Sequence, residues 1–191
     1  MEESGKWIVV MADEKAINTN KLTPEMLLAF LDRHEISHHT VHHPALYTVE
    51  QSKALRGEIE GLHVKNLFLK DKKGSLFLLT AVESTQIDLK NLHGRIGGQG
   101  RLSFCSPEQL MTYLGVEPGS VTPLALINDR DHRVSLVLDA ALLGGQRINV
   151  HPLVNTMTSG LSVEGFKKFL ELTGHHPQIL DPADEKLANL F

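Results

Sequence analysis

A lysine inside an apolar run is the first residue whose type and position could do chemistry. Lys65 lies in the segment Val64-Lys65-Asn66-Leu67-Phe68-Leu69, which is typical of a short buried strand. Side chains alternate along a strand, so Lys65 and Asn66 are expected on opposite faces. Burying an unpaired ammonium is costly. The lysine therefore either reaches solvent at the strand end, finds a partner or lines a polar cavity.

A glycine- and proline-rich stretch, Gly115 to Pro123, is the second candidate. Glycine lets the backbone turn tightly and approach a ligand, and main-chain N–H groups freed in such a turn can bind an anion or an oxyanion. The pattern is not a P-loop, because no lysine follows Gly119 and we predict no helix after it. The alternative interpretation is a helix C-cap followed by an ordinary turn into a strand.

A third candidate is the polar stretch that opens with His151 and continues to Asn155, Thr156 and Thr158. It directly follows a predicted strand, where functional loops often lie. The His151 imidazole could orient a substrate or carry a proton, whereas a lone histidine is more often a hydrogen-bonded structural group. The asparagine and the threonines could equally satisfy the backbone of their own loop.

Other reactive residue types give weaker signals. Four histidines, at positions 38, 39, 42 and 43, alternate across an extended segment, but no cysteine or acidic residue lies among them, so we expect no metal site. Cys105 has no neighbouring base in the sequence and is predicted to be a buried, inert thiol. The sequence contains no Gly-x-Ser-x-Gly elbow, so a serine hydrolase has no support.

The elements that would position these residues form one mixed α/β domain. Helix-start signals predict helices after Thr23, from Thr48 to Ile59, from Pro107 to Leu114, after Ser162 and from Pro182, with a short helix at 88–93. Apolar segments predict strands at 64–69, 76–82, 101–104, 121–127, 134–138 and 147–150. The first two strands should form a hairpin, and 121–127 should pair with 134–138.

Length and composition limit the class of protein. A chain of 191 residues suits one domain, which we place at 21–191, with 1–20 as a loosely attached extension. The single cysteine excludes an internal disulfide and fits the cytoplasm, and no apolar run approaches the ~20 residues that span a membrane. The net charge of −4 argues against a protein that coats nucleic acid, so DNA is not expected as a partner. The same net charge is compatible with a protein that contacts one end of an RNA through a local patch.

Together the three candidate stretches resemble one family. The strand at Lys65, the Gly-x-x-x-Pro loop from Gly119 to Pro123 and the His151-Pro152-Leu153 segment have the order and spacing of the YbaK-like aminoacyl-tRNA deacylases. These proteins are related to the editing insertion of bacterial prolyl-tRNA synthetase. The resemblance runs from about Leu22 to Leu180 and is greatest to the free-standing alanyl-tRNA(Pro) deacylase branch, often called ProX or PrdX. It implies an α/β domain with a mostly antiparallel, curved sheet and surrounding helices.

The resemblance also implies a pocket for the aminoacylated 3′ end of tRNA, hydrolysis of its ester bond and no cofactor. Lys65 would be the essential lysine, which holds a terminal phosphate or the aminoacyl group, and His151 would shape and polarise the pocket. Main-chain N–H groups of the glycine loop would stabilise the tetrahedral oxyanion. The implied substrate-binding residues are Thr48, Asn66, Gly119, Ser120, Val121, Thr122, Pro123, Asn155 and Thr156.

The leading prediction is hydrolysis of Ala-tRNA(Pro), because a small pocket admits alanine and excludes the bulkier proline ring. The same chemistry on Cys-tRNA(Pro) or Ser-tRNA is a first alternative. A module that binds aminoacyl-tRNA or a synthetase without catalysis is a second, and prolyl-tRNA synthetase is the partner that the family relationship suggests. The tRNA would need only local basic contacts, which makes binding sensitive to salt.

Overall fold

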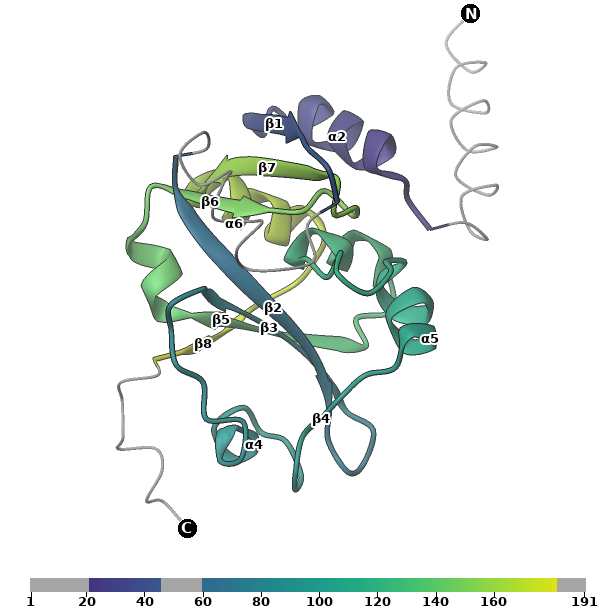
Figure 1. The fold of residues 1–191 in the computed structure, drawn as a ribbon, viewed down its shortest axis with the longest axis vertical. Coiled ribbons are helices and arrows are strands. Elements are labelled where there is room, and N and C mark those ends of the chain that lie inside the picture. Colours follow the sequence, from purple (N-terminus) through teal and green to yellow (C-terminus); the bar gives the residue numbers. More distant parts are fainter. Residues whose placement is uncertain (1–20, 46–59, 182–191) are drawn as a thin grey trace, which may run out of the picture.

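The computed structural model describes residues 21–45 and 60–181, and within them eight strands form one mixed sheet (Figure 1). The order of the strands is β1-β7-β6-β2-β3-β5-β8, with β4 paired to β2. The strands are β1 (His38–His42), β2 (Leu62–Lys70), β3 (Leu76–Val82), β4 (Ser103–Phe104), β5 (Val134–Asp139), β6 (Arg147–Val150), β7 (Met157–Ser162) and β8 (Gln178–Leu180). The predicted mixed α/β fold is confirmed.

Strand β2 is the centre of the sheet. It pairs antiparallel with β3 from Val64 to Lys70, as the predicted hairpin requires, and its end pairs with β4. Its beginning pairs parallel with β6 at Leu62 and His63. Four of the seven strand pairings in the described ranges are antiparallel, and β2–β6, β3–β5 and β5–β8 are parallel.

Helices of several kinds surround the sheet: α2 (Pro24–Arg33), α4 (Leu92–Arg95), α5 (Pro107–Gln109), the π-helical turn η1 (Leu110–Leu114), the 3-10 helices η2 (Pro123–Asn128) and η3 (Ala140–Gly144), and α6 (Val163–Leu172). The predicted caps at Thr23, Ser106 and Ser162 are present. Thr23 Oγ1 accepts from the Met26 N–H at 3.3 Å, and Ser162 Oγ accepts from the Gly165 N–H at 3.0 Å. Ser106 and Gln109 form a capping box at the start of α5.

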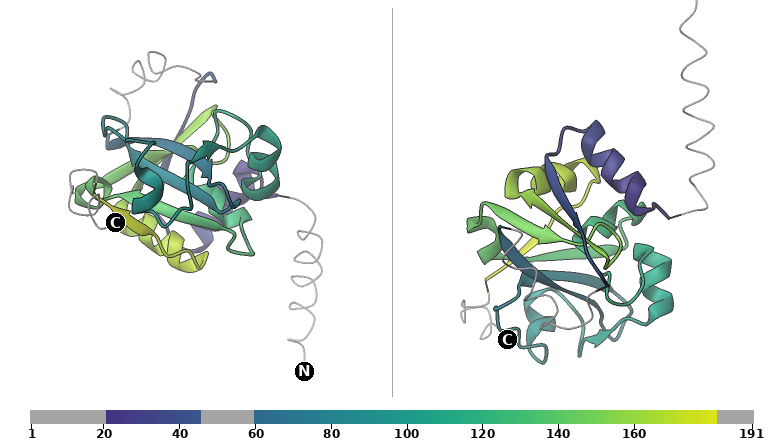
Figure 2. Two further views of the ribbon diagram at one scale, coloured as in Figure 1. Left: turned by 90° about the horizontal axis from the view of Figure 1, so that it is seen from below. Right: turned by 45° about the horizontal axis from the view of Figure 1, so that its top comes forward.

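Side-chain alternation along the strands divides the core into two clusters. One face of the sheet packs Phe68, Leu78 and Leu136 against leucines of α2 and phenylalanines of α6. The opposite face packs Leu69 and Leu79 with apolar residues of the 92–102 segment. Helices α2 and α6 lie together over the first face (Figure 2). The rings of Phe30 and Phe169 meet there edge to face, with their centroids 6.1 Å apart.

Several predicted elements differ from the observed ones. The predicted strand 121–127 is wrong, because Thr122 caps a 3-10 helix that begins at Pro123, and β5 pairs with β3 and β8 instead. An unbroken apolar run fits a buried helix as well as a strand. Strands β7 and β8 were not predicted, and the short helix expected at 88–93 is α4, which begins at Leu92. The extension 1–20, the helix 48–59 with Thr48, and the final helix lie outside the described residues.

Candidate functional site

Strand β2 directs Lys65 and Asn66 to opposite faces, as alternation predicts. The half-buried Lys65 donates from Nζ to the carbonyl oxygen of Glu83 at 3.1 Å and to that of Thr85. Asn66 donates from Nδ2 to the carbonyl oxygen of Val121 at 2.9 Å and accepts from Thr80 Oγ1 at 2.8 Å. The structure therefore joins Asn66 directly to the glycine loop. The Lys65 ammonium instead binds the turn that follows β3.

The glycine loop makes a tight turn that leaves main-chain donors available. Gly119 has φ of +89°, and the Ser120 N–H closes the turn on the Glu117 carbonyl oxygen at 3.0 Å. A proline followed by a left-handed glycine is the pattern of a type II turn. In the described part of the chain, the N–H groups of Gly119, Val121 and Thr122 make no hydrogen bond. Three donors within four residues can therefore bind an anion or a developing oxyanion.

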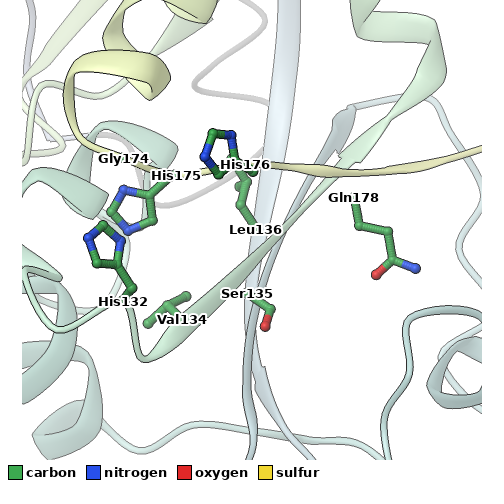
Figure 3. Close-up of a pocket in the computed structure, with 8 residues that line it drawn as sticks. All are labelled: His132, Val134, Ser135, Leu136, Gly174, His175, His176 and Gln178. Carbon is green, nitrogen blue, oxygen red and sulfur yellow. The ribbon is translucent and has the colours of Figure 1, made fainter.

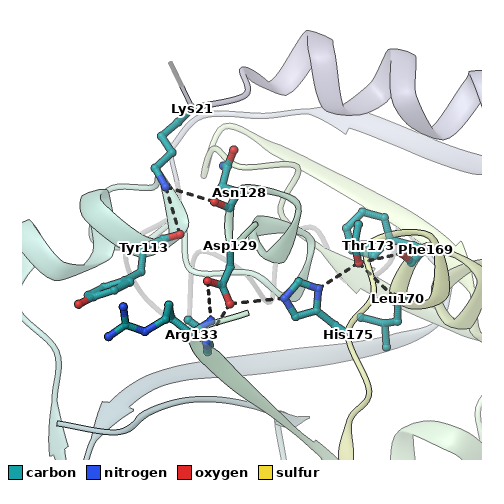
Figure 4. Close-up of polar contacts among 10 residues, drawn as sticks. Lys21, Tyr113, Asn128, Asp129, Arg133, Phe169, Leu170, Thr173 and His175 are labelled. Atoms are coloured by element: carbon teal, nitrogen blue, oxygen red, sulfur yellow. Dashed lines mark hydrogen bonds and ion pairs between the residues drawn. The ribbon is translucent and has the colours of Figure 1, made fainter. Parts of the chain in front are cut away.

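The base of this loop is held by residues that the sequence did not single out (Figure 4). Lys21 Nζ donates to the carbonyl oxygens of Tyr113 and Asn128, each at 3.3 Å. Asn128 donates from Nδ2 to the Leu114 carbonyl oxygen at 2.9 Å and accepts from the Leu22 N–H at 2.9 Å. Burial lowers the pKa of Lys21, although the nearby Asp129 opposes this effect. These contacts tie the helices on either side of the loop to the chain that precedes α2.

His151 begins the turn between β6 and β7, and its hydrogen bonding defines its tautomer. Its Nδ1 lies 2.8 Å from the carbonyl oxygen of Met157, which can only accept, so Nδ1 carries the proton. Burial lowers the pKa of His151; the hydrogen bond to Met157 opposes this, and the nearby His43 adds to it. A neutral ring leaves Nε2 as an acceptor, and Nε2 has no hydrogen-bond partner within the described ranges. Leu153 adopts a left-handed φ of +67°, a strained conformation often found beside functional sites.

The register of the parallel pair β2–β6 places Lys65 and His151 just beyond the end of the same strand pairing. The pairing ends at His63 opposite Asn149. Lys65 lies two residues after His63, and His151 lies two residues after Asn149. Because side chains alternate along a strand, we expect Lys65 on the face of His63 and His151 on the face of Asn149. The two strands separate beyond this point. The lysine and the histidine thus lie just beyond the last β2–β6 pair, on neighbouring segments, whereas the Asn66–Val121 bond holds the glycine loop on the face of β2 opposite Lys65.

The remaining predicted residues have different environments. Asn155 is buried in the turn before β7, and Thr156 is exposed, with its carbonyl oxygen accepting from the His43 N–H at 2.9 Å. Ser120, Thr122 and Pro123 are buried. Thr122 Oγ1 accepts from the Leu124 N–H at 3.3 Å, a capping role that binds the loop to η2.

Two further features do not belong to the predicted site. Cys105 is half-buried, and burial raises its pKa to about 11 despite the opposing charge of Lys70.

A pocket of about 340 Å³ is lined by no predicted site residue (Figure 3). Its lining is His132, Val134, Ser135, Leu136, Gly174, His175, His176 and Gln178. Among the described residues, no group of three or more His, Cys, Asp or Glu side chains is arranged to hold a metal ion.

The sequence matches a known family, described as the aminoacyl-tRNA editing domain, over residues 43–169. The match includes β2, the glycine loop and the His151 turn. The chain belongs to the aminoacyl-tRNA editing domain family. The resemblance inferred from the three motifs is thereby confirmed.

Relatives of this editing domain include two named proteins. Prolyl-tRNA synthetase associated domain-containing protein 1 of Bos taurus is 42% identical over 145 residues, which cover 74% of this chain and 84% of that protein. Prolyl-tRNA editing protein ProX of Acetoanaerobium sticklandii is 36% identical over 152 residues, which cover 79% of this chain and 92% of that protein. Both matches extend over most of the relative.

The fold also matches solved structures. A crystal structure of a proposed trans-editing enzyme for prolyl tRNA synthetase superposes with a TM-score of 0.57 and 23% identity, over 75% of this chain and 85% of that one. At this identity the match shows that the editing domain shares the fold. In the described part of the chain, no helix has the length and apolar character needed to cross a membrane.

Proposed function

We propose that this editing domain is a trans-editing deacylase that hydrolyses the ester bond of a mischarged aminoacyl-tRNA, with Ala-tRNA(Pro) as its substrate. The observation that carries the proposal is the glycine loop, which Asn66 fixes to β2 and whose N–H groups at Gly119, Val121 and Thr122 have no partner among the described residues. Donors held in place before the reaction stabilise a developing oxyanion strongly, because no reorganisation is needed. Membership of the editing family supports the same chemistry.

The proposed reaction needs no enzyme nucleophile. Water adds to the carbonyl carbon of the ester, and the resulting tetrahedral oxyanion accepts hydrogen bonds from the loop amides. The bond from that carbon to the 3′-terminal ribose oxygen then breaks, and the ribose oxygen takes the proton that the water gives up. The free amino acid and tRNA leave as products. No serine or cysteine is required as a nucleophile, which agrees with the raised pKa of Cys105.

Lys65 and His151 have separate roles in this proposal. Lys65 has three N–H donors and uses two of them on the carbonyl oxygens of Glu83 and Thr85, so the third can hold a phosphate or the acyl group of the substrate. His151 is neutral and offers Nε2 as an acceptor, which can bind the α-amino group of the substrate or the attacking water. Asn155 and Thr156, on the same turn, are proposed substrate contacts.

Substrate choice would follow from the size of the site. Exclusion of the proline ring by sterics protects correctly charged Pro-tRNA(Pro), since a rigid pocket rejects larger groups more effectively than it selects smaller ones. Alanine, cysteine and serine differ by a single heavy atom, a difference worth only about 10- to 200-fold in such a pocket. The three esters must therefore be compared directly.

The decisive experiment measures release of labelled amino acid from Ala-tRNA(Pro), Cys-tRNA(Pro), Ser-tRNA and Pro-tRNA(Pro). We expect Ala-tRNA(Pro) to be hydrolysed fastest and Pro-tRNA(Pro) to remain intact. The Lys65→Ala variant should fold and lose about 100-fold or more in kcat/KM. Wild-type rates in this variant would remove the role of Lys65. Binding of mischarged tRNA without any release by the wild-type protein would identify a binding module instead.

A further inference from the structure

Among the described residues, the Lys65 ammonium is held by a turn rather than by an acidic side chain. The turn follows β3 and supplies two main-chain carbonyl oxygens, those of Glu83 and Thr85. It is closed by the Thr85 N–H, which donates to the Val82 carbonyl oxygen at 3.0 Å, and it is joined to β2 by the Glu83 N–H, which donates to the His63 carbonyl oxygen at 2.9 Å. The position of the amine therefore depends on the shape of this turn.

Asp139, at the end of β5, fixes that shape. Its side chain is 1% exposed. One carboxylate oxygen, Oδ1, accepts from the Ala141 N–H at 3.0 Å and caps η3. The other, Oδ2, reaches a different element, where it accepts from the Val82 N–H at 3.1 Å and from the Thr85 hydroxyl. Capping a helix needs only the first oxygen, so the second has a separate role.

Thr85 connects the carboxylate to the amine. Its hydroxyl donates to Asp139, and its carbonyl oxygen accepts from Lys65. The negative carboxylate of Asp139 and the positive ammonium of Lys65 thus bind the two sides of Thr85. Hydrogen bonds to ionised groups are stronger than hydrogen bonds between neutral groups. Networks of this kind, in low-dielectric surroundings, fix the geometry of all their members.

We propose that Asp139 is a positioning residue, which acts through Thr85 to hold the Lys65 amine in one place with one N–H directed to the substrate. The inference rests on the proposed deacylation for its catalytic meaning. The carboxylate need not contact the substrate. Its contribution is to keep the turn, and therefore the amine, in one place while the phosphate or acyl group binds.

The test uses three variants of the full chain. Thr85→Val removes the hydroxyl and keeps the carbonyl, Thr85→Ser keeps both, and Asp139→Asn keeps the volume of the carboxylate. Trace labelling of amines with acetic anhydride, followed by mass spectrometry, reports the reactivity of Lys65 relative to the exposed Lys167 of α6. We expect the first and third variants to raise Lys65 labelling and to lower kcat/KM by about tenfold each. Thr85→Ser should match the wild type.

Asp129→Asn is the matched control for destabilisation. Asp129 is also buried and likewise accepts two main-chain N–H groups, from Arg133 and Val134, together with one side chain, His175. Unchanged Lys65 labelling in folded Thr85→Val, or an equal rise in Asp129→Asn, would overturn the proposal. The labelling reports the position of the amine whether or not the wild type releases amino acid. Failure of the proposed function would therefore be seen separately, in the deacylation assay.

Discussion

At the residue scale, His151 is the side chain whose ionisation can be followed. Its pKa is lowered chiefly by burial, from an ordinary value of 6.5, so the unfolded chain binds this proton more readily than the folded one. The stability that His151 contributes is therefore present above pH 6.5 and is lost as the pH falls toward the lower, folded pKa. The loss of the neutral ring should also reduce deacylation over the same range.

We predict that His151→Gln removes this part of the pH dependence. Urea unfolding at pH 7.5 and at pH 5.5 should show that the wild type loses more free energy of unfolding on acidification than the variant does. The variant should also lower kcat by on the order of 100-fold at pH 7.5, since a neutral acceptor at Nε2 is replaced by an amide. An identical pH dependence of stability in the two proteins would contradict the assigned neutral state.

Cys105 gives a second prediction at this scale. With a pKa of about 11, its thiol is almost entirely protonated near neutral pH. Because the thiolate is the reactive form, alkylation by iodoacetamide at pH 7.5 should be about 100-fold slower in the folded protein than in protein unfolded by urea. Cys105→Ala should deacylate at the wild-type rate. Rapid alkylation of the folded protein, with loss of activity, would show a functional thiol.

At the element scale, the glycine loop depends on its supports. Asn128 holds the end of η1 through the Leu114 carbonyl oxygen and the start of the described chain through the Leu22 N–H. Gly115 lies between these contacts with φ of +66°, and a Cβ there would come within 2.6 Å of Lys21. The helix-ending Gly115 was the one signal of this arrangement in the sequence. Nothing in the sequence indicated the contacts of Asn128 with Leu22 and Leu114.

We predict that Asn128→Ala lowers the free energy of unfolding by about 2 kcal/mol, because it leaves a buried carbonyl oxygen and a half-buried N–H without their partner. It should also lower kcat, since the loop amides lose their fixed position. Thermal unfolding and single-turnover deacylation measure the two effects. Asn91→Ala, which removes an exposed asparagine bonded to Asp88, is the control and should change neither. Reduced stability with an unchanged kcat would show that the loop is held by other contacts.

The elements that were predicted correctly are those with strong local signals. The hairpin β2–β3 has charged turn residues between apolar strands, and the helices at Pro24, Pro107 and Val163 have hydroxyl caps. Strand 121–127 was predicted wrongly because the apolar residues after Pro123 carry no periodicity that distinguishes a strand from a buried 3-10 helix. Strand β7 has Gly160 at its centre, and glycine is depleted in strands; the position of β7 between β1 and β6 comes from tertiary pairing.

At the scale of the whole molecule, β2 links three motifs far apart in the sequence: it carries Lys65, its Asn66 binds the glycine loop, and its beginning pairs with β6, which leads into His151. Their order along the chain predicted the family, but not the geometry. Local alternation placed Lys65 and Asn66 on different faces, whereas the carbonyl oxygens that bind Lys65 and the carboxylate of Asp139 belong to loops joined only by folding. No local pattern encodes such contacts, and the role of each predicted site residue remains a prediction for the assays above.

The distribution of charge gives the last prediction. Despite the net charge of −4, Lys72 and Lys73 are exposed at the β2–β3 turn, and Arg101 is exposed next to β4, which pairs with the same strand. If these cations bind phosphates of the tRNA, the double variant Lys72→Glu, Lys73→Glu should raise KM and leave kcat nearly unchanged. The slope of log(kcat/KM) against log[salt] should fall by about 2, one for each lost phosphate contact.

The matched control places the same charge change on another surface. Lys167 and Lys168 are exposed on α6, so Lys167→Glu, Lys168→Glu alters the net charge equally without altering the turn. Because long-range attraction depends on net charge, whereas contact depends on position, the two double variants separate these effects. An equal rise in KM in both would mean that the tRNA responds only to overall charge. A rise confined to the turn variant would place the tRNA at the β2–β3 turn.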